Sequence, residues 1–171
     1  GFNIGVDTNH GDATLSSSII NIATVADDEP AVVIASANNS NVNLQATQKL
    51  TLKGDSVIDN DNSKVIIGNN SSTLQTELEG NIINKNNGYI AAFVNNAGSS
   101  FTGNTTDVHW QDVTTRDAGN KGIHLTLNDA SVWNDFDYDS TIQVLDTSKA
   151  KVDMQDNKFK GLFIGTLTKR S

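Results

Sequence analysis

The sequence predicts an all-β solenoid, and three observations support this fold class. Short stretches in which apolar and polar residues alternate recur along the chain, and turns of similar length separate them. The turns consist of Asn, Asp, Ser and Gly, and no window long enough for a helix has convincing helical spacing. Only 6% of the residues are aromatic and 36% are hydrophobic. This composition suits a solenoid, because each circuit of the chain, or coil, buries only a thin row of apolar side chains.

The first part of the chain contains irregular and regular segments. Residues 1–14 have few apolar side chains and predict an irregular lead-in or a partial first coil. Strands are expected at Ser18 to Val25 and at Ala31 to Ala35, separated by a loop at Pro30, which lacks a backbone donor. From Asn41 onward the alternation is regular, and it predicts short strands at residues 42–44, 50–52, 57–58, 65–67, 82–83, 89–94 and 99–102.

The spacing of the apolar segments predicts an inserted loop or hairpin at residues 104–121. Phe101 and Trp133 belong to two similar segments, but the interval between them exceeds the roughly 20 to 25 residues expected for one coil. A His beside a Trp in such a loop is more typical of a contact residue than of a catalytic base. The candidate contact residues of this loop are His109, Trp110 and Arg116.

The stretch from residue 122 to residue 167 has the clearest organisation. Ile123, Leu125 and Leu127 alternate with polar residues and predict a half-buried strand. Further short apolar segments follow, separated by turns rich in Asn, Asp and Ser. Interior positions are predicted for Leu125, Leu127, Leu145, Val152, Ile164 and Leu167, and Leu162 is expected to be fully buried.

The order of elements in this stretch resembles the C-terminal end of a pertactin-like autotransporter passenger. The elements are ASVWN at 130–134, DSTI at 139–142, LDT at 145–147, VDM at 152–154 and FKGLFIGTL at 159–167. The resemblance implies a single-stranded right-handed parallel β-helix (solenoid) for residues 1–171, as a passenger fragment. It also implies that residues 122–167 form autochaperone-like last coils. The family usually continues into a Gly-rich turn and another strand, whereas this chain stops at Thr168-Lys169-Arg170-Ser171.

The same resemblance implies a folding role for the last coils. In autotransporters this segment lies upstream of an outer-membrane β-barrel of the same polypeptide, emerges first at the cell surface and templates the coils that follow. A terminal coil has only one neighbour, so nucleation there is costly unless the coil is rich in apolar and aromatic side chains. The expected folding nucleus consists of Trp133, Leu145, Val152, Phe159, Leu162, Ile164 and Leu167.

The charge and the absence of cysteine limit the classes of binding partner and the cellular compartment that we expect. The formal net charge is −8; residues 1–115 carry 12 acidic and 4 basic side chains, and residues 116–171 carry 8 of each. The acidic excess repels phosphate backbones, so no nucleic-acid partner is expected. A Cys-free, Asn-rich chain fits a bacterial surface protein better than a disulfide-stapled eukaryotic domain. We therefore expect a protein at the bacterial cell surface or secreted, exported through the periplasm.

Three motifs with possible chemistry are better explained as structure. Gly54-Asp55-Ser56 resembles the nucleophile motif of serine protease autotransporters, but Val57 replaces its second glycine. The run at residues 59–63 begins like an EF-hand calcium loop, but Lys64 stands at the required glycine position. The alternating carboxylates of residues 135–139 fall in an expected turn. No catalytic, cofactor-binding or metal-binding residue is therefore predicted.

The leading hypothesis is a non-enzymatic surface passenger that acts in adhesion or self-association. Its partner would be a host glycan, a matrix protein or the same protein on another cell, contacted through ladders of polar side chains. One alternative is an enzyme-related role, either the stalk of a secreted protease or a polysaccharide-active β-helix enzyme. Such an enzyme would need clustered carboxylates near a basic residue, which the sequence does not indicate. Another alternative is a purely structural stalk.

Overall fold

The computed structural model describes residues 3–112, 121–135, 138–154 and 159–170, and it is all-β. Fourteen strands join in one sheet, and no helix occurs among these residues. The strands are β1 (Ile4–Asn9), β2 (Asp12–Ala23), β3 (Val32–Ala37), β4 (Asn41–Asp61), β5 (Lys64–Ile67), β6 (Gln75–Lys85), β7 (Tyr89–Asn95), β8 (Ser100–Thr102), β9 (Thr105–Asp107), β10 (Gly122–Asn128), β11 (Val132–Asn134), β12 (Ser140–Ser148), β13 (Lys151–Asp153) and β14 (Leu162–Arg170).

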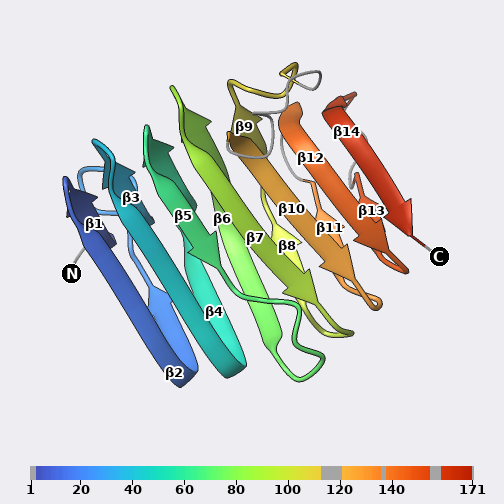
Figure 1. The fold of residues 1–171 in the computed structure, drawn as a ribbon, viewed down its shortest axis with the longest axis horizontal. Coiled ribbons are helices and arrows are strands. Elements are labelled where there is room, and N and C mark those ends of the chain that lie inside the picture. Colours follow the sequence, from blue (N-terminus) through green and yellow to red (C-terminus); the bar gives the residue numbers. More distant parts are fainter. Residues whose placement is uncertain (1–2, 113–120, 136–137, 155–158, 171) are drawn as a thin grey trace.

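Every strand pairing in the described chain is parallel. Paired residues in the middle of the chain are 23 to 26 positions apart, as for Val42 with Val65. This step agrees with the coil length expected from the sequence. Because the chain advances in one direction at each step, β1 and β14 lie at opposite ends of the molecule (Figure 1).

The pairings fall into three rows. The long strand β4 contributes to all three, because register shifts between Ala46 and Lys49 and near Ser56 divide it into three segments. The first row contains residues 12–17, residues 41–46, β5, β7, β10, β12 and β14. The second contains residues 19–23, 49–53 and 75–79, then β8, β11 and β13. The third contains β1, β3, residues 56–61, residues 81–85 and β9.

The core consists of apolar ladders that run along these rows. In the first row Leu44, Ile67, Ala92 and Leu125 pair in succession, and all four are fully buried. Side chains alternate between the two faces of a strand, so the residues next to each ladder residue in its own strand point outward. Full burial of a Leu or Ile side chain contributes about 1.5–3 kcal/mol. The ladders therefore stabilise the fold although the low hydrophobic content is too small for a compact core.

Of the two expectations for the first residues of the chain, the partial first coil fits the described part and the irregular lead-in does not. Residues 4–9 form β1, and β2 already begins at Asp12. β2 begins before the strand expected at Ser18 to Val25, and its side chains are mostly exposed because it pairs with β4 alone. Residues 12–17 contain one large apolar side chain, Leu15, so the pairing of this half of β2 leaves a weak signal in the sequence.

The predicted similarity of the segments around Phe101 and Trp133 is confirmed. These two residues pair between β8 and β11, and their rings stack with centroids 5.5 Å apart and an interplanar angle of 24°. Trp133 is fully buried, and its indole N–H donates to the Gly103 carbonyl at 3.0 Å. Such a stack contributes about 0.5–1.5 kcal/mol beyond area burial.

The predicted interior positions near the C-terminal end are confirmed only in part. Leu125, Leu127 and Leu145 are buried, but Val152, Leu162 and Ile164 are half-buried, and Leu167 is 58% exposed. Phe159, expected in the folding nucleus, is fully exposed. The reason lies in the sheet order, which ends at β13 and β14, so their inward-facing side chains are covered from one side only.

The range predicted as an insertion begins inside the sheet. Residues 105–107 form β9 and pair with β6, and Thr105 and Asp107 are buried. Residues 108–112 form a turn outside the strands, and residues 113–120, with Arg116, lie outside the described residues. The predicted insertion does lie between β7 and β10, where paired residues have the largest sequence separation in the described sheet: 33 positions from Ile90 to Ile123. The short polar segment of β9 gave no apolar alternation from which it could be predicted.

Candidate functional site

Three turns between strands of the first and third rows lie on one another and form a polar surface. This turn stack consists of residues 38–40, 62–63 and 86–88. Asn39 N donates to the Asn62 carbonyl at 3.0 Å, and Asn62 N donates to the Lys85 carbonyl at 3.3 Å. Asn39 and Asn62 have φ angles of 60° and 51°, a left-handed conformation that Asn tolerates better than most residues. The excess of Asn in the sequence is thus partly explained by these turns.

An open groove of about 740 Å³ runs over the turn stack. Amide and hydroxyl side chains dominate its lining, together with two lysines and one aromatic ring. The lining residues are Asn39, Ser40, Asn41, Asn62, Ser63, Lys64, Asn87, Tyr89 and Lys121. We call this feature the turn-stack groove.

Tyr89 is the aromatic residue of the groove. Its ring is half-buried, with the His124 ring edge-on at 5.0 Å and the Lys64 ammonium 6.0 Å from its centroid. Burial raises the pKa of the Tyr89 phenol above its ordinary value of 10. The hydroxyl therefore stays protonated at neutral pH, so it can donate as well as accept a hydrogen bond to a ligand.

A buried polar ladder supports the groove from inside. The Ser36 hydroxyl donates to Asn60 Oδ1 at 2.6 Å, and Asn60 Nδ2 donates to Asn84 Oδ1 at 3.0 Å. Asn60 and Asn84 also donate to the carbonyls of Ser63 and Gly88, at 2.6 and 2.8 Å. Because those carbonyls belong to the turn stack, the ladder fixes the position of the turns from which the groove is built.

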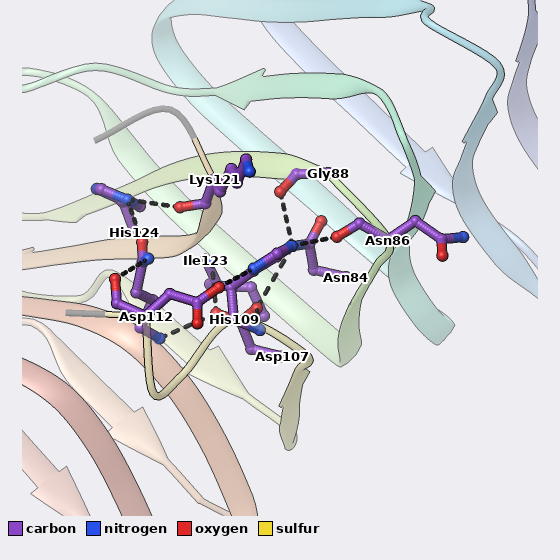
Figure 2. A network of polar contacts seen from close by, with 10 residues as sticks. Asn84, Asn86, Gly88, Asp107, His109, Asp112, Lys121, Ile123 and His124 are labelled. Atoms are coloured by element: carbon purple, nitrogen blue, oxygen red, sulfur yellow. Dashed lines mark hydrogen bonds and ion pairs between the residues drawn. The ribbon is translucent and has the colours of Figure 1, made fainter. Parts of the chain in front are cut away.

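The predicted contact residues His109 and Trp110 lie in the turn after β9, and neither lines the groove. His109 bonds to Asp112 through Nδ1 and to the Asn86 carbonyl through Nε2 (Figure 2). It thereby attaches the turn after β9 to the turn stack. The Trp110 ring lies 5.7 Å from the Phe163 ring of β14. In the structure both side chains make contacts within the chain.

Two further candidates from the sequence have structural partners. Asp55 Oδ2 accepts from the Ala31 backbone N–H at 2.8 Å, and Ser56 lies within β4. In the run resembling an EF-hand, Asp59 forms an ion pair with Lys85 at 3.2 Å. No group of three or more His, Cys, Asp or Glu side chains suited to a metal ion occurs in the described ranges.

Sequence reasoning did not find Tyr89 and Lys64 as site residues. They are 25 positions apart, and they meet only because β5 and β7 pair Lys64 with Tyr89. One signal was present in the sequence. Each of the three strands that leave the turn stack is preceded by an Asn, and this Asn is followed by a small residue or by another Asn. That repeat marks equivalent turns, and the residue after each turn faces the groove.

Comparison of the chain with protein-family models, with curated proteins and with solved structures gave no significant match. Within the part of the chain that the structure describes, no helix is long and apolar enough to cross a membrane.

Proposed function

We propose that this chain is a fragment of a non-enzymatic bacterial surface passenger, folded as a single-stranded right-handed parallel β-helix. Three rows of parallel strands support this architecture, with paired residues 19 to 33 positions apart over the described chain. The right hand follows from the strong preference for right-handed crossovers between parallel strands. Export through the periplasm and an outer-membrane β-barrel in the same polypeptide belong to the same proposal, and they rest on the resemblance at residues 130–167.

The passenger acts in adhesion or self-association, and the turn-stack groove is its contact surface. The observation that carries this assignment is the groove lining, in which amides, hydroxyls and Lys64 surround the protonated phenol of Tyr89. Such a surface makes many weak polar contacts, and repetition across copies on a cell converts them into avidity. The ligand is a host glycan, a matrix protein or the same protein on another cell.

The test compares two groove variants with a matched lysine variant outside the groove. Tyr89→Ala and Lys64→Gln remove the ring and the ammonium of the groove, whereas Lys49→Gln removes an exposed lysine on β4 that does not line it. Binding is measured on a glycan array, on immobilised matrix proteins and between coated beads. We expect each groove variant to lose about tenfold in binding, equivalent to about 1.4 kcal/mol. Equal losses in the Lys49→Gln variant, or no loss in the groove variants, would contradict the assignment.

A further inference from the structure

The turn-stack groove is positively charged, although the chain as a whole is acidic. Its described lining contains Lys64 and Lys121 and no carboxylate, whereas the formal net charge of the chain is −8. Neither lysine forms an ion pair with a described residue. Lys53 and Lys85, by contrast, pair with carboxylates at 3.1 and 3.2 Å. The groove therefore offers two ammonium groups to an anionic ligand, and such charge-assisted bonds are stronger than neutral ones.

The backbone around both lysines is held by the sheet. Lys64 of β5 lies between Asn41 and Tyr89 in the first row, because it pairs with both. Lys121 immediately precedes β10, and its carbonyl lies 3.1 Å from His124 Nε2 (Figure 2). The next residue, Gly122, donates its N–H to the Gly88 carbonyl of the turn stack at 2.8 Å. Two segments far apart in the sequence are thus fixed beside the same groove.

The remaining lining indicates a ligand rich in hydroxyl groups. Amides and hydroxyls both donate and accept hydrogen bonds, and they belong to Asn39, Ser40, Asn41, Asn62, Ser63 and Asn87. No aliphatic side chain belongs to the described lining, and Tyr89 is its aromatic residue. The centre of a protein interface is instead built from apolar and aromatic anchors that fill pockets. The groove therefore fits a sugar better than a folded protein.

The charge around the groove limits how many anionic groups such a ligand can carry. The exposed carboxylate of Asp12 accepts from the Asn41 amide at 2.9 Å, and Asp61 accepts from the Asn86 amide at 2.5 Å. A chain of anionic sugars that extends beyond the groove would meet these carboxylates and the acidic excess of residues 1–115. A ligand with one anionic group avoids this repulsion.

We propose that the turn-stack groove binds an oligosaccharide that is neutral except for one anionic group, a carboxylate or a sulfate. This inference rests on the proposed function, in which the groove is the contact surface, and it selects one class among the ligands named there. Lys64 and Lys121 bind the anionic group. The amides, the hydroxyls and the Tyr89 phenol bind the neutral sugars.

The experiment compares four immobilised glycans that differ in charge: lactose, lactose with one sialic acid, lactose with one sulfate, and heparin. Dense immobilisation makes weak binding measurable through avidity. We expect the unmodified chain to bind at least one of the two singly charged forms about tenfold better than lactose, the size of one charge-assisted hydrogen bond. The form that binds better identifies the anionic group. High salt should reduce this preference, because exposed charges are screened.

Matched lysine variants assign the preference to the groove. Lys64→Gln and Lys121→Gln should each lower it, and the double variant should bind charged and neutral lactose about equally, because removal of both ammonium groups leaves the neutral contacts. Lys49→Gln removes the same charge from an exposed lysine outside the groove and should keep the preference. Retained binding to lactose and an unchanged circular dichroism spectrum check that each variant is folded.

The outcomes separate this inference from the proposed function. Groove binding that Tyr89→Ala abolishes, but that favours lactose, heparin or a matrix protein over singly charged lactose, would overturn the inference and leave the proposed function intact. A preference that persists in the double lysine variant would do the same. Binding that Tyr89→Ala leaves unchanged, or binding to none of these ligands, would overturn both.

Discussion

Asp107 ends the buried ladder of Ser36, Asn60 and Asn84, and its chemistry differs from theirs. It is 2% exposed, and its two oxygens accept only. Oδ2 accepts from the backbone N–H groups of Ile123 and Gln143 at 2.7 and 2.9 Å, and Oδ1 accepts from His109 N at 3.0 Å (Figure 2). Asn84 Nδ2 also donates to Oδ1, at 3.4 Å, so the two oxygens accept from four donors in four segments of the chain. This is why a carboxylate follows the two amides in the ladder.

We predict that Asp107→Asn destabilises the fold by about 1–3 kcal/mol, the usual cost of a buried group without a partner. Whichever way the amide turns, its NH₂ group faces N–H donors. The control is Asp12→Asn, which removes the same charge from an exposed carboxylate that accepts one bond from Asn41 at 2.9 Å. Its effect should stay within about 0.5 kcal/mol. Urea unfolding measures both, and equal midpoints for the two variants would contradict this account.

At the scale of elements, a column of glycines lets successive strands approach where the second row meets the third. Gly103 has a φ of 154°, and a Cβ at this position would lie within 2.7 Å of the Gly80 carbonyl carbon. A Cβ on Gly80 would in turn lie 2.4 Å from the Gly54 carbonyl oxygen. Neither position has room for a side chain, because the atoms it would meet are backbone.

We predict that Gly103→Ala costs about 1–3 kcal/mol, because the added methyl must push backbone away or force the strained φ. Gly11→Ala is the matched control, since the nearest atom to its Cβ would be the Asn9 carbonyl oxygen at 4.0 Å. That substitution should be nearly neutral. Thermal unfolding of the two variants tests this prediction. A Gly103→Ala variant as stable as Gly11→Ala would contradict the role assigned to the glycine column.

For the whole molecule, the sequence predicted the strand-rich class and the repeat, but not the layout of the site. Alternation identified the inward residues of the middle strands, such as Val42 and Leu44, because burial on one face leaves a period of two. It identified the second half of β2 but not residues 12–17 or β9, whose pairing involves the backbone and few large apolar side chains. The groove could not be predicted from the sequence for another reason: its residues come from separate turns, and only the register of the sheet brings them together.

The folding role of the last coils is best tested by kinetics, because the structure gives burial and not the order of events. Leu145 is 2% exposed in β12, and Leu44 is fully buried in β4. Truncation of either to Ala should cost about 2–5 kcal/mol. If the C-terminal coils nucleate folding, Leu145→Ala should slow refolding by nearly its full equilibrium cost, whereas Leu44→Ala should mainly speed unfolding.

Stopped-flow refolding and unfolding, followed by Trp fluorescence, measure this partition. Trp133 is a suitable reporter, because it becomes fully buried against Phe101 on folding. The half-buried Ile164 provides a second probe of the same end, since Ile164→Val removes one methyl group and should act on the refolding rate in the same direction. A refolding rate that falls for Leu44→Ala but not for Leu145→Ala would place the nucleus in the first coils and exclude a templating role for residues 122–167.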